Sequence, residues 1–344
     1  MRFFKAAVRI GGFLAGLVIL LFLMNQIFSP RKWYPGGYIQ DRNGRTAMLS
    51  CEEPETLDII NVGDSESDTS FSPLYVWQEE GYTSANIGCD GMTIPECHAV
   101  LKKMFRTQSP RVVLVESNLL YRSSVKKIMR STVAEPLYDI FEGLRYHNLW
   151  KYCWKDRGSR LYFQGYLINE QISPYTGKED YMDPTEETED VDILNEFWLG
   201  RIRRLCIKNG AVPVLWSAPS PANYTMKKHN SLAGLSQKYG IDYFDCNLYL
   251  KEIGIDWAKD TLDRGDHLNC SGAEKTSLWL ARKLKEDFTL TDHRTEESYA
   301  KAWDPVLERY QTMKEMMTGM HSENLPEEVR DFIQSGGDFR QPGF

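Results

Sequence analysis

The sequence predicts an α/β protein in which helices cover both faces of a mainly parallel sheet, preceded by one membrane-spanning helix. Two observations support this. From residue 57 onward, short apolar and β-branched segments alternate with segments of helical periodicity. The first thirty residues also contain one long apolar run. Because parallel strands need a crossover helix between them, this alternation indicates a three-layer α/β/α fold of the flavodoxin-like type.

The N-terminal segment, residues 1–30, reads as a retained membrane anchor. Arg2, Lys5 and Arg9 precede an apolar run over 10–28, and about 20 such residues span a bilayer. A cleaved signal peptide is the alternative, but no small-x-small cleavage site ends the run. Basic residues flank both ends, so charge gives only a weak orientation bias. We expect the short N-terminus inside and the rest of the chain outside.

After a polar linker at 31–56, the α/β domain is expected at 57–290. The expected strands are 57–62, 84–88, 111–116, 212–217 and 242–245. The expected helices are 72–80, 94–107, 191–209, 227–239 and 271–288. A helical insert is expected at about 123–190, followed after the domain by a C-terminal helical extension at 291–344.

The charge, the cysteine spacing and the missing phosphate loop argue against several classes of protein function. The net charge is -7, and no basic cluster follows the N-terminus, so we expect no nucleic-acid partner. Seven cysteines are scattered without zinc-ligand spacing and read mostly as buried hydrophobes. A disulfide between Cys89 and Cys97 is kept as an alternative. No glycine-rich phosphate loop follows the first strand, which disfavours a nucleotide binder. We expect neither a metal nor a cofactor.

Two motifs about 200 residues apart carry groups for acyl transfer. Gly63-Asp64-Ser65 follows the first strand, and His267 lies in a polar loop before the last helix of the domain. A serine hydroxyl needs a neighbouring imidazole to take its proton, and a carboxylate to orient that imidazole. Asp263 and Asp266 are both candidates for the carboxylate. Asp263, four residues before His267, can reach the imidazole ring more easily than the adjacent Asp266.

The attacked carbonyl becomes an oxyanion that needs hydrogen-bond donors. The candidates are the backbone N–H of Ser65, the backbone of Gly88 and the side chain of Asn118, all at or just past expected strand ends. In parallel sheets these ends meet at one edge. Each residue also has a simpler interpretation: Asp, Ser and Asn commonly cap helices or close turns. Ser67 is the rival hydroxyl and is expected to cap a helix.

These residues resemble the SGNH (GDSL-like) hydrolase superfamily. Gly63-Asp64-Ser65 matches its first block, Asn86-Ile87-Gly88 looks like its second, and Asn118 is the candidate for its third. The fifth block is Asp-x-x-His, from which this chain departs: position 264 is Arg264, and the acids stand at 263 and 266. The resemblance implies the SGNH hydrolase fold, a serine nucleophile and His267 as its base.

The chain is more specifically similar to membrane-anchored envelope proteins of this superfamily, such as the D-alanine transfer protein of teichoic acid modification and the alginate acetylation proteins. The stretch 256–272 and Tyr146-His147-Asn148-Leu149-Trp150 look like signatures of that type. The resemblance implies a single-pass protein of the bacterial cell membrane whose catalytic domain is extracytoplasmic. Its substrates would be a cell-envelope glycopolymer and an acyl donor, and such proteins often work beside a multi-pass membrane O-acyltransferase.

The resulting hypothesis is a membrane-anchored serine acyl esterase or O-acyltransferase that acts on cell-envelope polysaccharide or teichoic acid through an acyl-enzyme on Ser65. The alternative is a non-catalytic envelope protein of the same fold that binds polysaccharide or an acyltransferase. The irregular acid spacing before His267 motivates that alternative.

Overall fold

The computed structural model describes residues 1–28, 52–147, 164–166, 168–178 and 181–317. At its centre lies a parallel sheet of five strands in the order β2-β1-β3-β4-β5. The strands are β1 (Ile59–Val62), β2 (Ser84–Asn86), β3 (Val112–Glu116), β4 (Val212–Ser217) and β5 (Asp242–Asp245). This is the flavodoxin-like strand order, so the predicted fold class is confirmed.

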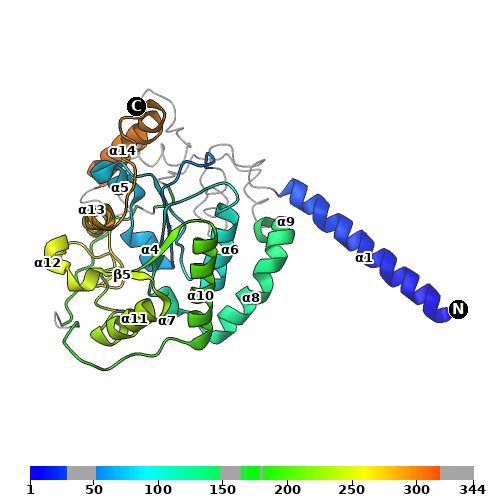
Figure 1. Cartoon of the computed structure of the whole chain (residues 1–344). Coiled ribbons are helices and arrows are strands. Elements are labelled where there is room, and N and C mark those ends of the chain that lie inside the picture. The colour runs from blue at the N-terminus through cyan, green and yellow to red at the C-terminus, as the bar shows by residue number, and fades with distance from the viewer. Residues whose placement is uncertain (29–51, 148–163, 167, 179–180, 318–344) are drawn as a thin grey trace.

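Helices cover both faces of the sheet (Figure 1). Successive side chains of a strand point to opposite faces, and the core divides accordingly. Ile60, Val113 and Leu215 pack in one cluster with α6 (Ile94–Met104), α10 (Ile193–Lys208) and α11 (Met226–Tyr239). Ile59 and Leu114 pack in the other with α13 (Cys270–Asp287). Helix α5 (Pro73–Glu80) packs against α13, and α14 (Glu297–Met317) packs against α5.

Most expected elements occur within a few residues of their predicted bounds. The strands at 212–217 and 242–245 agree fully, and the helices expected at 191–209 and 271–288 each shift by one or two residues. Three short helices were not predicted: α4 (Ser65–Ser70), α7 (Leu119–Arg122) and α12 (Leu250–Ile253). Each is too short to show an amphipathic period. Two of them, α4 and α7, follow strands at the edge where the motifs gather.

The expected insert contains α8 (Val125–Ile140) and α9 (Glu142–Tyr146), while 148–163 lies outside the described residues. The N-terminal helix is α1 (Arg2–Ile27). It is long and apolar enough to cross a membrane, with a mean hydropathy of 2.3 over its most apolar window. The tail beyond residue 317 is also outside the described part of the chain, as is Trp150 of the envelope-type signature.

The five cysteines in the described residues are buried and form no disulfide (Cys89, Cys97, Cys206, Cys246, Cys270). Their interpretation as small buried hydrophobes is confirmed, and no disulfide joins Cys89 to Cys97. Cys51 and Cys153 lie outside the described residues.

A buried polar network fixes the ends of the central strands. Asn61 and Asn86 are register partners on β1 and β2, and the Nδ2 of Asn61 donates to Asn86 Oδ1 at 3.2 Å and to Ser67 Oγ at 3.0 Å. Trp216 Nε1, on β4, donates to Asn61 Oδ1 at 2.9 Å. Because buried polar groups are costly unless paired, this network holds the start of α4 in one place on the sheet edge.

Close helix packing generates a stability prediction at Gly272 of α13. A Cβ there would lie 2.5 Å from the backbone oxygen of Asp260, so Gly272→Ala should lower the free energy of unfolding by about 1–3 kcal/mol through overpacking. At Gly234 of α11 a Cβ would meet nothing within 4 Å. Gly234→Ala should therefore raise the free energy of unfolding by about 0.5–1 kcal/mol. Chemical denaturation of both variants tests the pair, and equal effects would contradict the packing argument.

Candidate active site

Ser65 stands at the first position of α4, directly after the turn that leaves β1. Asp64 is the N-cap, and its Oδ1 accepts a hydrogen bond from the backbone N–H of Glu66 at 3.1 Å. A Cβ on Gly63 would lie 2.5 Å from the Cβ of Ser67 and 2.7 Å from that of Glu116. Only glycine fits this turn without displacement, and the tight turn leads the chain directly from the strand end to Ser65.

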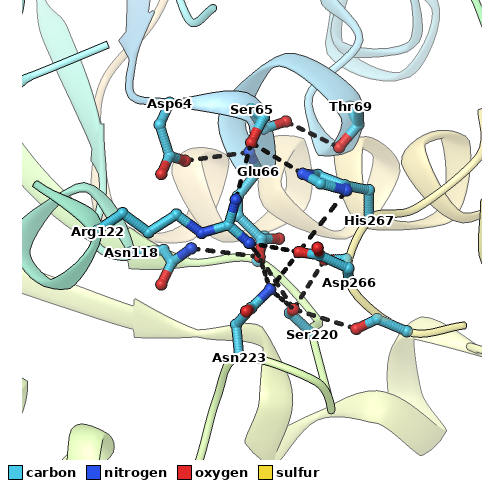
Figure 2. A network of polar contacts seen from close by, with 12 residues as sticks. Asp64, Ser65, Glu66, Thr69, Asn118, Arg122, Ser220, Asn223, Asp266 and His267 are labelled. Atoms are coloured by element: carbon cyan, nitrogen blue, oxygen red, sulfur yellow. Dashed lines mark hydrogen bonds and ion pairs between the residues drawn. The ribbon is translucent and has the colours of Figure 1, made fainter. Parts of the chain in front are cut away.

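Ser65 and His267 meet although 202 residues separate them (Figure 2). Ser65 Oγ lies 2.8 Å from His267 Nε2. On the other side of the ring, His267 Nδ1 lies 2.7 Å from Asp263 Oδ2. With the proton on Nδ1, Asp263 accepts and Nε2 is left to accept from the serine hydroxyl, which is the order of contacts in a Ser-His-Asp relay.

The loop that carries His267 folds back so that its two sides contact each other. An isolated bridge pairs Thr261 with Leu268, and the chain turns back through Arg264 and Gly265, both with positive φ. Gly265 N–H donates to Thr261 Oγ1 at 2.6 Å. The backbone N–H of His267 donates to Asp263 Oδ1 at 2.7 Å, so Asp263 holds both the backbone and the ring of the histidine.

Asp266 has a different set of partners. Its Oδ1 is 3.7 Å from His267 Nδ1, beyond hydrogen-bond distance, and it accepts instead from Arg122 and Asn223. The structure therefore brings Asp263, rather than Asp266, into contact with the imidazole. The four-residue spacing succeeds because the αL turn at Arg264 and Gly265 folds Asp263 back beneath the ring.

Arg122 is a charged neighbour of Ser65 that the sequence analysis missed. It extends from the end of α7, and its Nη1 lies 3.4 Å from Ser65 Oγ. Its other terminal nitrogen pairs with Asp266 and lies 3.9 Å from Glu66 Oε1. One signal was available: Arg122 follows Asn118 by four residues, so both side chains leave the same short segment after β3 on one side.

Glu66 joins three loops beneath the nucleophile. Its Oε1 accepts from Ser220 Oγ at 2.9 Å, from Asn223 Nδ2 at 2.8 Å and from Asn118 Nδ2 at 3.3 Å. Ser220 also donates to the backbone oxygen of Asp266 at 2.8 Å, as Figure 2 shows. The helix of Ser65 and the loop of His267 are thus linked through Glu66 and Ser220, which follows β4.

The three oxyanion-hole candidates lie at the same edge of the sheet. Two of them already donate hydrogen bonds to protein groups. Gly88 N–H donates to Asn86 Oδ1 at 3.0 Å, and a Cβ on Gly88 would lie 2.1 Å from Ser67 Oγ. Asn118 is the N-cap residue of α7, and its amide donates to Glu66. Ser65 N–H stands at the start of α4. The roles of Ser65, Gly88 and Asn118 as oxyanion donors stay predictions.

Ser67, the rival hydroxyl, is fully buried and occupied. It accepts from Asn61 and contacts Asn86 Oδ1 at 3.2 Å. Its expected capping role is filled by Asp64 instead, because Asp64 directly precedes the first turn of α4. Ser67 therefore contributes to the network that fixes α4 on the sheet.

Three carboxyl groups are buried next to Ser65, and their pKa values are all raised. Burial is the main cause in each case. It raises the pKa of Asp64, and it raises the pKa of Glu116 to about 8 with a further contribution from Asp64. Glu66 has its pKa pushed well above the usual range by burial and by the neighbouring Glu116 and Asp64. The positive charge of Arg122 lowers the pKa values of Asp64 and Glu66 and so partly offsets the effect of burial.

His267 is a stronger base here than in water. Burial on its own lowers the pKa of the imidazole, but the hydrogen bond to Asp263 and the charges of Asp266 and Asp263 outweigh it, so the pKa is raised. Asp263 changes in the opposite sense: burial raises its pKa, and the hydrogen bonds from His267 outweigh this and lower it. Both shifts favour an imidazolium paired with a carboxylate once a proton is taken up.

Asp263, Asp266 and His267 offer three possible metal-ligand atoms within 4.8 Å of one another. However, both ring nitrogens of His267 already bond to protein groups, Ser65 and Asp263. A metal on this group would have to displace one of them. The donor set therefore fits proton transfer better than metal binding.

The sequence matches no protein-family model and no curated protein. Solved structures that are similar include a GDSL-like lipase from Bacteroides thetaiotaomicron, with 10% identity, 72% of this chain and 100% of that chain covered, and a TM-score of 0.36. Another is the lipase/acylhydrolase from Enterococcus faecalis, with 11% identity, coverage of 68% and 99%, and a TM-score of 0.35. Identities and TM-scores this low leave the reaction to be inferred from the side chains of this chain.

The contact geometry predicts which acid supports His267. Asp263→Asn should slow the phosphonylation of Ser65 by a fluorophosphonate by about 10⁴-fold, the loss seen when the orienting Asp of another Ser-His-Asp hydrolase is amidated. Asp266→Asn leaves the hydrogen bond between Asp263 and the imidazole ring in place, so it should slow the reaction by about tenfold or less. Rate constants from intact-protein mass spectrometry test the order, and a larger loss in Asp266→Asn would reverse the assignment.

The raised pKa of His267 predicts the pH dependence of the same reaction. Only the neutral imidazole can accept the serine proton, so the rate should rise with pH through a midpoint above the ordinary histidine value of about 6.5. Asp266→Asn removes one cause of the rise and should move the midpoint to lower pH. Asp256→Asn, which changes an exposed acid paired with Lys259, is the control and should leave it unchanged. A midpoint below 6.5 in the unmodified protein would contradict the electrostatic account.

Proposed function

We propose that this chain is a membrane-anchored serine acyl esterase or O-acyltransferase of the SGNH type. The observation that carries the proposal is the continuous relay from Ser65 Oγ through His267 to Asp263, with contacts of 2.8 and 2.7 Å. A hydroxyl, an imidazole and a carboxylate in this order are what nucleophilic acyl transfer requires. The irregular spacing of the acids before His267 favoured a non-catalytic protein. That spacing no longer favours it, because Asp263 contacts the imidazole ring of His267.

In the first half-reaction, Ser65 Oγ attacks the carbonyl carbon of an acyl ester while His267 Nε2 takes the hydroxyl proton. The resulting imidazolium is stabilised by the Asp263 carboxylate at Nδ1. The bond from the carbonyl carbon to the leaving oxygen then breaks, and His267 returns the proton to that oxygen. The donor alcohol departs, and the acyl group is left as an ester on Ser65.

The carbonyl oxygen carries negative charge in this step, and the chain has cationic and amide donors around it. Arg122 Nη1, 3.4 Å from Ser65 Oγ, is close enough to stabilise charge that develops beside the nucleophile. Ser65 N–H, Gly88 N–H and Asn118 Nδ2 are the further donors proposed for the oxyanion. Gly88 and Asn118 must release their present acceptors to serve, so we expect substrate binding to redirect them.

In the second half-reaction, His267 removes a proton from the acceptor as the acceptor oxygen attacks the carbonyl carbon of the acyl-enzyme. The bond from that carbon to Ser65 Oγ then breaks, and His267 returns the proton to Oγ, which restores the free serine. Water as acceptor gives an esterase, and a polymer hydroxyl gives an O-acyltransferase. The proposed acceptor is cell-envelope polysaccharide or teichoic acid, by resemblance to anchored envelope proteins. The helix α1 is the proposed single-pass anchor of an extracytoplasmic domain in a bacterial membrane, and a multi-pass membrane O-acyltransferase is a proposed partner and source of acyl groups.

The full chain in detergent should react with a fluorophosphonate and carry one adduct, on Ser65, because within the part of the chain that the structure describes this is the serine hydroxyl that contacts an imidazole base. Ser65→Ala and His267→Ala should abolish the adduct. Ser67→Ala, the matched control two residues away, should keep it. Peptide mapping by mass spectrometry locates the modification. Absence of any adduct from folded wild-type protein would overturn the catalytic proposal in favour of a polysaccharide-binding role.

A further inference from the structure

Helix α8 presents a line of large aliphatic side chains to solvent. Val125, Met129, Val133, Leu137 and Ile140 are each 49–64% exposed. They recur every three or four residues, so they lie along one face of the helix. The buried residues of α8, Ile128, Ser131 and Glu135, mark another face, and α8 packs there against α6. The aliphatic stripe is therefore the outer face of a helix whose inner face is already used.

The stripe continues into the end of α1. Asn25, near the C-terminus of α1, donates from Nδ2 to the backbone oxygen of Ile140 at 2.9 Å and accepts from Gly143 N–H at 2.8 Å. Phe22 and Phe141 meet edge to face with ring centroids 5.5 Å apart. A Cβ on Gly143 would lie about 3 Å from the backbone of α1. The apolar face of α8 thus begins where the proposed anchor ends.

The charges on α8 suit a negatively charged surface. Lys126, Lys127 and Arg130 are exposed in its N-terminal half and form no ion pair within the described residues. The acids of the helix point elsewhere: Glu135 is buried and pairs with Arg145, and Asp139 pairs with Lys102 and Arg106. A helix with aliphatic residues on one face and unpaired basic residues beside them is typical of segments that lie in a bilayer interface.

The arrangement of the two helices fits this position. Figure 1 shows α1 and α8 diverging from the region of α9, with α8 at the edge of the domain on the side from which α1 projects. If α1 crosses the bilayer, α8 runs out along its surface from the point where α1 emerges. Sixteen residues of helix span about 24 Å, and the far end of α8 begins three residues after Arg122 of the active site.

We propose that α8 is a membrane-surface helix that inserts its aliphatic stripe into the lipid headgroup region and holds the active site beside the bilayer. This rests on the proposed anchoring by α1 and adds a second contact with lipid. Docked in this way, the site would take acyl donors or acceptors that are themselves held at the membrane surface, rather than soluble esters free in the surrounding medium.

The test uses the full chain reconstituted into phosphatidylcholine vesicles that contain phosphatidylglycerol. A photo-crosslinking benzoylphenylalanine replaces Val133 in one protein and Leu248 in a control. Leu248 is similarly exposed and apolar, but it follows β5 at the opposite edge of the domain from α1 (Figure 1). After irradiation, mass spectrometry should find phospholipid adducts at position 133 in several-fold excess over position 248.

A charged variant separates docking from folding and catalysis. Met129→Glu, Val133→Glu and Leu137→Glu together change only exposed positions, so Ser65 should still react with a fluorophosphonate in detergent. With the crosslinker at Val125 instead, this variant should lose most of the lipid adducts that the parent gives there.

Equal adducts at 133 and 248, in protein that resists alkaline extraction from the vesicles, would overturn α8 docking while leaving the anchor intact. An adduct between position 133 and another polypeptide would assign the stripe to a protein partner and overturn it as well. Neither result would affect the catalytic proposal, which fails only if Ser65 does not react.

Discussion

One buried carboxyl group, that of Glu66, connects the helix that carries Ser65 with the loops around His267. One oxygen of Glu66 accepts from Asn118, Ser220 and Asn223, which follow two different strands. Ser220 then holds the backbone of Asp266 at 2.8 Å, next to His267 in the chain. Since Glu66 directly follows Ser65, the nucleophile and its base are positioned by the same group. The loop of His267 is held further by Arg122 and Asn223, which both donate to Asp266, and by the backbone N–H of Ala222, which donates to the Gly265 oxygen at 3.1 Å.

This arrangement places three acids beside a serine that must develop negative charge, which would oppose the reaction if all were ionised. Burial resolves the conflict by raising their pKa values, to about 8 in the case of Glu116. Burial raises the pKa of Glu66 well above the usual range, which favours its neutral form, and a neutral carboxyl group still accepts hydrogen bonds. Arg122, which faces both Ser65 and Glu66, supplies the positive charge that remains. The acid cluster and the arginine are therefore parts of one electrostatic balance.

Sequence reasoning recovered the parts of this molecule that depend on local pattern. The buried strand expected at 111–116 was visible because its β-branched run is short and continuous, and the convergence of motifs followed from parallel topology. Asn223 and the role of Glu66 were not visible, because each acts through side chains from distant segments, and Arg122 had only its spacing from Asn118 as a signal. Spacing favoured Asp263 over Asp266 but left both open, since the outcome depends on the αL turn at Arg264 and Gly265. Short helices such as α4 escaped detection for lack of a full period.

Helix α8 links the proposed active site to the proposed membrane anchor, although the two are far apart along the chain. Its first residue, Val125, comes three positions after Arg122, which contacts the nucleophile, and its last, Ile140, bonds to Asn25 of α1. The helix between these points is about 24 Å long, so it separates the end of the proposed anchor from the segment that carries Arg122. A flexible tether would let the site sample a wide shell of solvent. A helix whose face also binds lipid confines it to the membrane surface, so substrate choice would follow from location as well as from the shape of the site.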